Sequence, residues 1–187
     1  MARIDQLVAS YQRHVGLPLK ANLPLSQRVW FVVYAPEDER RMMNRIQEFE
    51  LATREARLGW QRLDLTAAFA DWIDTFDVSE RDRVLADQEL VEAYADPGFT
   101  EFLRGKLKEM ADAVPATEAI RTVFAITGLM ELYDFVHVSD VIDPEQLTFP
   151  GVLLVFFPGE REANTYRFLG ARDGWNYLAV PILGGEN

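Results

Sequence analysis

The chain contains no cysteine and only two histidines. Without cysteine there can be no disulfide, thiolate nucleophile, iron–sulfur cluster or cysteine-ligated zinc site, and this composition is typical of a reducing compartment. Because His14 and His137 lie far apart in the sequence, a histidine metal site would need carboxylates to complete it.

The short motifs of common nucleotide-binding and hydrolytic sites are also absent. Gly105 and Lys106 are followed by Leu107 inside a predicted helix, so they cannot form a phosphate-binding loop. The sequence contains no G-x-G-x-x-G, G-x-S-x-G or H-E-x-x-H pattern. We therefore expect no catalytic constellation and no cofactor.

Basic residues are scarce: 19 Lys and Arg stand against 30 Asp and Glu, which gives a net charge of −11. Because nucleic-acid binding draws much of its energy from basic contacts with phosphates, this balance argues against direct DNA or RNA binding. Apolar runs such as residues 151–157 are far shorter than the roughly 18 residues of a membrane helix. The first residues lack the apolar core of a signal peptide. The sequence therefore predicts a cytoplasmic protein without a membrane contact.

Strand-like and helix-like segments alternate along the chain and predict one α/β domain over residues 1–187. Apolar residues at helical spacing indicate a helix over residues 3–15. Residues 28–35 lack polar alternation, as strands covered on both faces do. A helix that Gly59 closes follows, with further strands at 60–65, 122–127 and 151–157. This order predicts a three-layer, Rossmann-like or P-loop-like fold, with a mostly parallel central sheet and helices on both faces.

Two segments depart from this alternation. Residues 79–114 predict a helical insertion or cap on the sheet, whose first helix begins at the capping-box pattern from Ser79 to Asp82. Near the C-terminal end, predicted strands at 166–169 and 176–182 flank Asp173-Gly174, which is a common hairpin turn. A C-terminal β-hairpin is therefore expected.

Polar residues follow the predicted strands at the positions where open α/β sheets bind ligands. Because the carboxyl ends of parallel strands share one edge, we expect them to gather there: Glu37, Asp38, Glu39, Asp64, Thr127, Gly128, Gly159 and Glu160. Carboxylates at such an edge could hold Mg²⁺, which prefers oxygen ligands. The alternative is that the first acids cap a helix and residues 158–160 form a turn.

The segment after the third predicted strand contains the second histidine. His137 lies between Asp134 and Asp140 and close to Ser139. A general-base role is conceivable for it, and a solvated loop histidine is the alternative.

The helix after the first predicted strand carries arginines at positions 40, 41, 45, 54 and 57. We expect these arginines to pair with neighbouring glutamates. An interface with an acidic patch of a partner is the alternative.

Two segments around the third and fourth predicted strands form a recognisable pattern. They are Ile126-Thr127-Gly128-Leu129-Met130-Glu131-Leu132-Tyr133-Asp134-Phe135-Val136 and Val155-Phe156-Phe157-Pro158-Gly159-Glu160. Together with the early strand at 30–36 and the late segment Asn176-Tyr177-Leu178-Ala179, they resemble the BrxB family of bacterial phage-exclusion (BREX) defence systems. Asp134, His137 and Ser139 stand where that family usually has Pro, Arg and His, so the chain resembles a divergent member.

The resemblance implies a small, non-catalytic accessory component of an antiphage complex. Its partner would be the large alkaline-phosphatase-like component (PglZ), together with other BREX subunits. Tyr133 and Phe135 are then candidates for contact with a partner. Two alternatives remain open. One is a degenerate nucleotide-binding or Mg²⁺-dependent phosphoester domain that uses Asp64, Glu37 or Glu160, and the other is a homodimeric domain with a small ligand.

Overall fold

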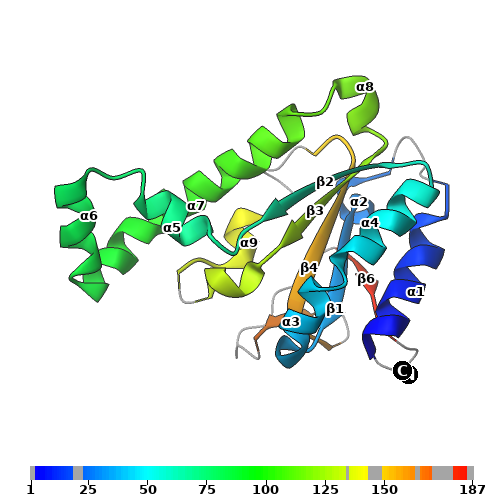
Figure 1. Cartoon of the computed structure of the whole chain (residues 1–187), viewed down its shortest axis with the longest axis horizontal. Coiled ribbons are helices and arrows are strands. Elements are labelled where there is room, and N and C mark those ends of the chain that lie inside the picture. The colour runs from blue at the N-terminus through cyan, green and yellow to red at the C-terminus, as the bar shows by residue number, and fades with distance from the viewer. Residues whose placement is uncertain are drawn as a thin grey trace.

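The computed structural model describes residues 3–18, 23–133, 135–142, 149–162, 165–169 and 179–184. Its strands are β1 (Val29–Tyr34), β2 (Gly59–Asp64), β3 (Thr122–Thr127), β4 (Val152–Glu162), β5 (Thr165–Phe168) and β6 (Val180–Ile182). Five of them form a parallel sheet in the order β2-β3-β4-β1-β6, and β5 pairs with β4 in the antiparallel sense. The predicted α/β fold with a mostly parallel sheet is confirmed (Figure 1).

The three strands β1, β3 and β4 are buried on both faces, as their unbroken apolar sequences predict. Alternate side chains of β1 enter two different cores. Phe31 packs on one face with Phe157 of β4, and Val32 packs on the other face with Phe156. Because the side chains of a strand alternate in direction, one apolar run supplies both cores.

The face that carries Val32 and Phe156, which we call the first face, is covered by α1 (Arg3–Val15) and α4 (Ile46–Glu55). The short helices α2 (Leu25–Arg28), η1 (Pro36–Asp38) and α3 (Glu39–Met43) lie between α1 and α4 in the sequence, and Met42 of α3 joins the same core. The single helix predicted after β1 is therefore three helical pieces. The last piece, α4, ends at Glu55, and Arg57 beyond it has a left-handed φ of 59°. Gly59, which was predicted to close the helix, is the first residue of β2 instead.

The second face packs against α5 (Ala68–Ile73), η2 (Leu129–Leu132), α9 (Val138–Val141) and the second half of α7 (Gln88–Asp112). The one-turn helix α8 (Ala116–Ala119) then leads into β3. With helices on both faces of the sheet, the described part of the chain has the predicted three layers (Figure 1).

A helical arm projects from this second layer (Figure 1). It consists of α6 (Val78–Leu85) and the first part of α7, which bends at Asp96, before Pro97. The helix α6 begins before the predicted Ser79, because the carboxylate of Asp77 accepts the backbone N–H of Glu80 at 2.9 Å. A carboxylate is as good an N-cap as a serine hydroxyl, so the pattern alone could not select between them.

The predicted C-terminal hairpin has different strands. Instead of ending before Pro158, β4 continues to Glu162 and pairs with β5, so that Glu160 lies opposite Arg167. The strand β6 does not pair with β5 in the described residues, and it lies parallel to β1 at the sheet edge. The Asp173-Gly174 turn lies outside the described residues. Pairing with β6 satisfies the amide and carbonyl groups on the outer edge of the buried strand β1, which would otherwise lack hydrogen-bond partners.

Within the described residues, the structure contains no helix that is both long enough and apolar enough to span a bilayer.

Candidate functional site

The carboxyl edge of the sheet brings Asp64 and Thr127 together, since they are register partners at the ends of β2 and β3. One Asp64 carboxylate oxygen accepts the backbone N–H of Thr66 at 3.1 Å and its hydroxyl at 2.6 Å. Arg62 pairs with the other oxygen at 3.0 Å. Partial burial would raise the pKa of Asp64, but the hydrogen bonds from Thr66 and the charge of Arg62 outweigh burial and hold this pKa below its ordinary value.

Gly128 is fixed at this edge by the turn after β2. It has a left-handed φ of 77°, and a Cβ built on it would lie 2.6 Å from the Thr66 nitrogen and 2.9 Å from Asp64 Oδ1. The Thr127 side chain is fully buried, and its hydroxyl lowers the pKa of Asp64 although it makes no hydrogen bond of ordinary geometry. Asp64, Thr127 and Gly128 thus form one compact unit, as predicted from their places after the strands.

Of the three acids that were predicted to lie at this edge after β1, Glu39 is the one whose carboxyl interacts with the carboxylates there. The buried Tyr34 donates its hydroxyl to Glu39 Oε2 at 2.5 Å. Burial raises the pKa of Glu39. The hydrogen bond from Tyr34 lowers it, and the nearby carboxylates of Asp64 and Glu131 raise it further. The sequence signal for this hydrogen bond is the spacing: Tyr34 ends a buried strand and stands five positions before Glu39, across the turn at Pro36.

The carboxyl edge is therefore negatively charged. Three carboxylates, those of Glu39, Asp64 and Glu131, lie near enough to interact electrostatically. In the described part of the chain, no group of three or more His, Asp or Glu residues has the arrangement of a metal site. A phosphate at this edge would be repelled by the carboxylates, whereas a cationic group would be attracted.

The other predicted edge residues do not join this unit. Glu37 is exposed, and Asp38 pairs with Arg41 at 3.1 Å. Asp38 is the N-cap residue of α3, but its side chain makes no capping hydrogen bond, unlike the alternative in which these acids cap a helix. Gly159 is an internal residue of β4, where a Cβ would collide with the carbonyl oxygen of Arg167 on β5. Glu160 is exposed on the same strand. The segment 158–160 is therefore a continuation of β4 and not the predicted turn.

Three of the residues proposed as partner contacts, Tyr133, Phe135 and His137, lie between η2 and α9. The Phe135 ring stacks on that of Phe69, with centroids 4.2 Å apart, and is half-buried. Tyr133 remains 43% exposed, with its ring near Phe168. His137 is exposed at the start of α9, and Asp134 lies outside the described residues.

A continuous series of aromatic contacts joins the arm to the sheet layer. From Phe135 and Phe69 it passes to Phe99 and Trp72, then through Phe76 to Tyr94. Neighbouring ring centroids in this series lie 4.2–5.8 Å apart, in the range of favourable aromatic pairs. We call these six residues the aromatic ladder. The ladder fixes the direction in which the arm projects.

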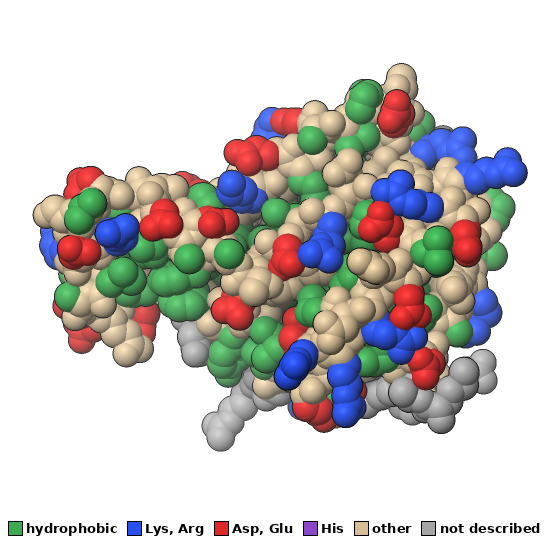
Figure 2. All heavy atoms as spheres, in the orientation of Figure 1, with side chains coloured by type: hydrophobic (Ala, Val, Ile, Leu, Met, Phe, Trp, Pro, Cys, Tyr) green, Lys and Arg blue, Asp and Glu red, His purple; other side chains and the backbone are tan. Residues whose placement is uncertain are grey.

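The arm tip, defined as residues 77–96, is acidic with exposed apolar positions. It carries seven Asp and Glu residues against two arginines. On α6, Val78 is 65% exposed and Leu85 is 53% exposed. Figure 2 shows hydrophobic side chains along the lower side of the arm, bordered by acidic ones. An exposed apolar group within a charged rim is typical of a protein-binding surface.

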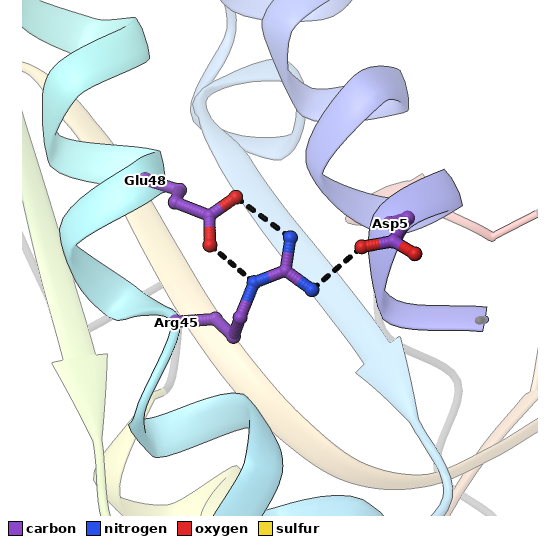
Figure 3. A network of polar contacts seen from close by, with 3 residues as sticks. All are labelled: Asp5, Arg45 and Glu48. Carbon is purple, nitrogen blue, oxygen red and sulfur yellow. Dashed lines mark hydrogen bonds and ion pairs between the residues drawn. The ribbon is translucent and has the colours of Figure 1, made fainter. Parts of the chain in front are cut away.

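Two of the arginines after β1, Arg45 and Arg54, pair with neighbouring glutamates as expected, and Arg41 pairs with Asp38 instead. Arg54 pairs with Glu50 at 2.7 Å. Arg45 donates from Nε and Nη2 to the Glu48 carboxylate and from Nη1 to Asp5 of α1 at 2.6 Å (Figure 3). The hydrogen bonds from Arg45 lower the pKa of Glu48. This network ties α1 to α4 on the surface of the first layer.

Comparison with known proteins gives no relative for this chain: no protein-family model, no curated protein and no solved structure matches it.

Proposed function

We propose that this chain is a non-catalytic accessory subunit of a BREX-type antiphage complex, and that it binds a larger, alkaline-phosphatase-like partner of the PglZ type. The observation that carries the proposal is the projecting arm, whose tip exposes apolar side chains. The resemblance of residues 126–136 and 155–160 to the BrxB family supplies the kind of partner. The arm supplies a surface to which such a partner would bind.

The apolar groups of the arm tip support binding of a protein. Val78 and Leu85 are more than half exposed, although burial of such a side chain typically contributes about 1.5–3 kcal/mol. Both residues lie on α6, which packs against α7 and projects away from the sheet. A partner that covers α6 would remove these two side chains from water.

The charge of the arm tip indicates the chemistry of the partner surface. Seven acidic residues against two arginines favour a partner with a basic patch beside an apolar one. Association between such surfaces weakens as salt increases, because ions screen the attraction between exposed charges. The apolar part of the contact is expected to persist at high salt.

The aromatic ladder supports the same function by limiting the cost of binding. Phe99 and Trp72 are buried in the core, and Tyr94 and Phe76 extend their contacts into the arm. An arm held in one direction loses little conformational freedom when a partner binds.

The alternative of a nucleotide-binding or phosphoester domain is less well supported by the sheet edge. The carboxylates of Glu39, Asp64 and Glu131 face the place where a phosphate would lie in such a fold. Arg62, which could otherwise offer a positive charge to a phosphate, is already paired with Asp64. We therefore retain the partner-binding function.

The test is affinity capture of the tagged protein from its native lysate, with mass spectrometry of the retained proteins. The double variant Val78→Ser/Leu85→Ser removes the apolar groups of the arm tip. Leu51→Ser is the matched control, since Leu51 is 58% exposed on α4, away from the arm. We expect the unchanged protein and the control to retain a large alkaline-phosphatase-like protein, and the double variant to retain at least about tenfold less.

Two results would contradict the proposal. The unchanged protein could retain no phosphatase-like protein after a moderate salt wash, or the double variant could retain as much of it as the control. Circular dichroism of the purified variants establishes that a loss of capture does not come from unfolding.

A further inference from the structure

A pocket of about 490 Å³ lies at the opposite, amino-terminal edge of the sheet. Its wall is formed where the chain enters the strands: Arg28 precedes β1, Leu58 precedes β2, and Ile120 and Arg121 precede β3. The end of α1 closes one side with Val15 and Leu17. The volume is within the range of about 300–1,000 Å³ that is common for small-molecule sites.

The backbone that forms the pocket wall just before β4 is closely packed. Gly151 has no space for a side chain, because a Cβ on it would collide with the carbonyl oxygens of Ala119 and Thr122. The loop before β4 is also tied to the sheet by Arg28, whose Nη1 donates to the carbonyl oxygens of Phe149 at 2.6 Å and Pro150 at 3.2 Å. The pocket is thus bounded by anchored backbone on this side.

The charge in this pocket is opposite to that of the chain as a whole. Arg28 and Arg121 both line it, and neither pairs with a carboxylate among the residues that the structure describes. Among the described residues, the Arg121 guanidinium donates only to the Arg57 carbonyl oxygen, at a distance of 3.5 Å. In the same part of the chain, Arg28 keeps a buried Nε–H without an acceptor. Buried donors of this kind are rare and call for an acceptor.

The remaining wall is mainly apolar. Leu17 and Ile120 are 61% and 59% exposed, although both line the pocket. A ligand that fills the pocket would remove apolar side chains from water and would bring an acceptor to the arginines. A ligand that meets both conditions has an apolar body and one anionic end.

We propose that this pocket, which we call the arginine pocket, binds a small molecule that has an apolar body and a terminal carboxylate, such as a medium-chain fatty acid. The carboxylate lies against Arg121 and Arg28, since guanidinium groups bind carboxylates through two parallel hydrogen bonds. The apolar body lies against Val15, Leu17 and Leu58. This inference is independent of the function proposed for the arm, which lies on another part of the molecule.

The test is isothermal titration calorimetry of the purified protein with octanoate, butyrate and octan-1-ol. We expect octanoate to bind more tightly than the other two. Butyrate has the charge and a shorter apolar body, and each methylene that reaches the wall strengthens binding about fourfold. Octan-1-ol has the apolar body and lacks the charge that the arginines require.

Two variants locate the site. Arg121→Gln is expected to raise the Kd for octanoate about tenfold, as the loss of one charge-assisted contact would. Ala56→Leu is expected to weaken octanoate because Ala56 lines the pocket and the larger side chain occupies part of its volume. The matched control is Lys108→Gln, which removes one positive charge from an exposed position on α7 and is expected to leave the Kd unchanged.

Three results would overturn the proposal: no binding of octanoate to the unchanged protein, equal affinity for octanoate and octan-1-ol, or an Arg121→Gln variant that binds as tightly as the Lys108→Gln control. Binding of a hydrophobic peptide through its free C-terminus, without binding of octanoate, would also overturn it. Because the titration needs no partner protein, its failure is distinguishable from a failure of the capture experiment.

Discussion

The hydrogen-bonded pair Tyr11–Thr53 offers a direct test of the packing between α1 and α4. Both side chains are fully buried, and their hydroxyl oxygens are 2.6 Å apart. Thr53 Oγ1 donates its single proton to the Phe49 carbonyl oxygen at 2.8 Å, so the proton between the two hydroxyls must belong to Tyr11. Burial raises the pKa of Tyr11, which keeps this donor protonated across the ordinary pH range.

This assignment of the proton makes the two single variants unequal. Thr53→Val removes the acceptor and leaves the Tyr11 hydroxyl buried without a partner, at a cost of about 1–3 kcal/mol in the free energy of unfolding. Tyr11→Phe removes the donor, while Thr53 still donates to Phe49, and is expected to cost about 1 kcal/mol. In the double variant the Tyr11 hydroxyl is absent, so Thr53→Val no longer leaves a buried donor without a partner. Its cost should therefore be about 1 kcal/mol less than the sum of the two single costs.

The assay is equilibrium unfolding in urea, followed by tryptophan fluorescence. Trp30, Trp60 and Trp72 are all buried, so unfolding changes their environment. Each kcal/mol should also lower the melting temperature by about 2–4 °C in a chain of this size. Additive single costs, or a Tyr11→Phe variant less stable than Thr53→Val, would refute the reasoning about the proton.

Three further predictions concern other parts of the chain. Gly128→Ala is expected to lower the free energy of unfolding by about 2–3 kcal/mol, because of the left-handed φ and the contact with Thr66. Gly105→Ala, in open space on a helix, should raise it by about 0.5–1 kcal/mol, and thermal melts of the two variants compare these effects. Because the pKa of Glu39 is raised, the folded state binds its proton more tightly and loses stability as pH rises above about 4.3. Glu39→Gln should thus be more stable than the unchanged protein at neutral pH, and urea titrations at pH 7 should show this advantage while those at pH 3.5 should not. The pKa of Glu48 is lowered, so its contribution to stability is present at neutral pH and is lost as pH falls below the ordinary pKa of a glutamate. Arg45→Gln should reduce this acid-dependent loss of stability by less than about 1 kcal/mol, because the pair is at the surface. Unfolding free energies measured from pH 7 to pH 3 would show the difference.

The sequence was most informative where local and tertiary preferences agree. The first helix was predicted at its observed bounds, because α1 has apolar side chains on one face only. The strand at residues 122–127 was also predicted at its observed bounds, since all of its side chains are buried. The pairing of β6 with β1 was not predicted, because pairing depends on which sheet edge is available and not on the strand's own residues.

The candidate site was predictable only in part. Position after a strand was enough to find Asp64, Thr127 and Gly128, because all parallel strands end at one edge. Gly159 and Glu160 follow Pro158, which lies opposite Tyr34 at the end of β1, but they belong to β4, because this strand continues beyond its apolar run to pair with β5. Position after the strand also pointed to Glu39, but its hydrogen bond to Tyr34 was not predicted, because the bond crosses a turn and sequence spacing alone does not show it. The arginine pocket has residues from five separate segments, so no local pattern could indicate it.

The position of β1 in the sheet has a consequence for synthesis on the ribosome. Its two neighbours are β4 and β6, so the strand emerges long before either partner exists. Residues 34 and 152 are separated by roughly 120 positions, which take about 6–24 seconds to translate at 5–20 residues per second. For that interval the run Val29–Tyr34 has no strand to pair with, and its exposed apolar surface is a target for chaperones and a risk for aggregation. Slow translation of the region between β3 and β4 would lengthen this exposure, and expression yield should therefore respond to codon choice there more than in the segment after β4.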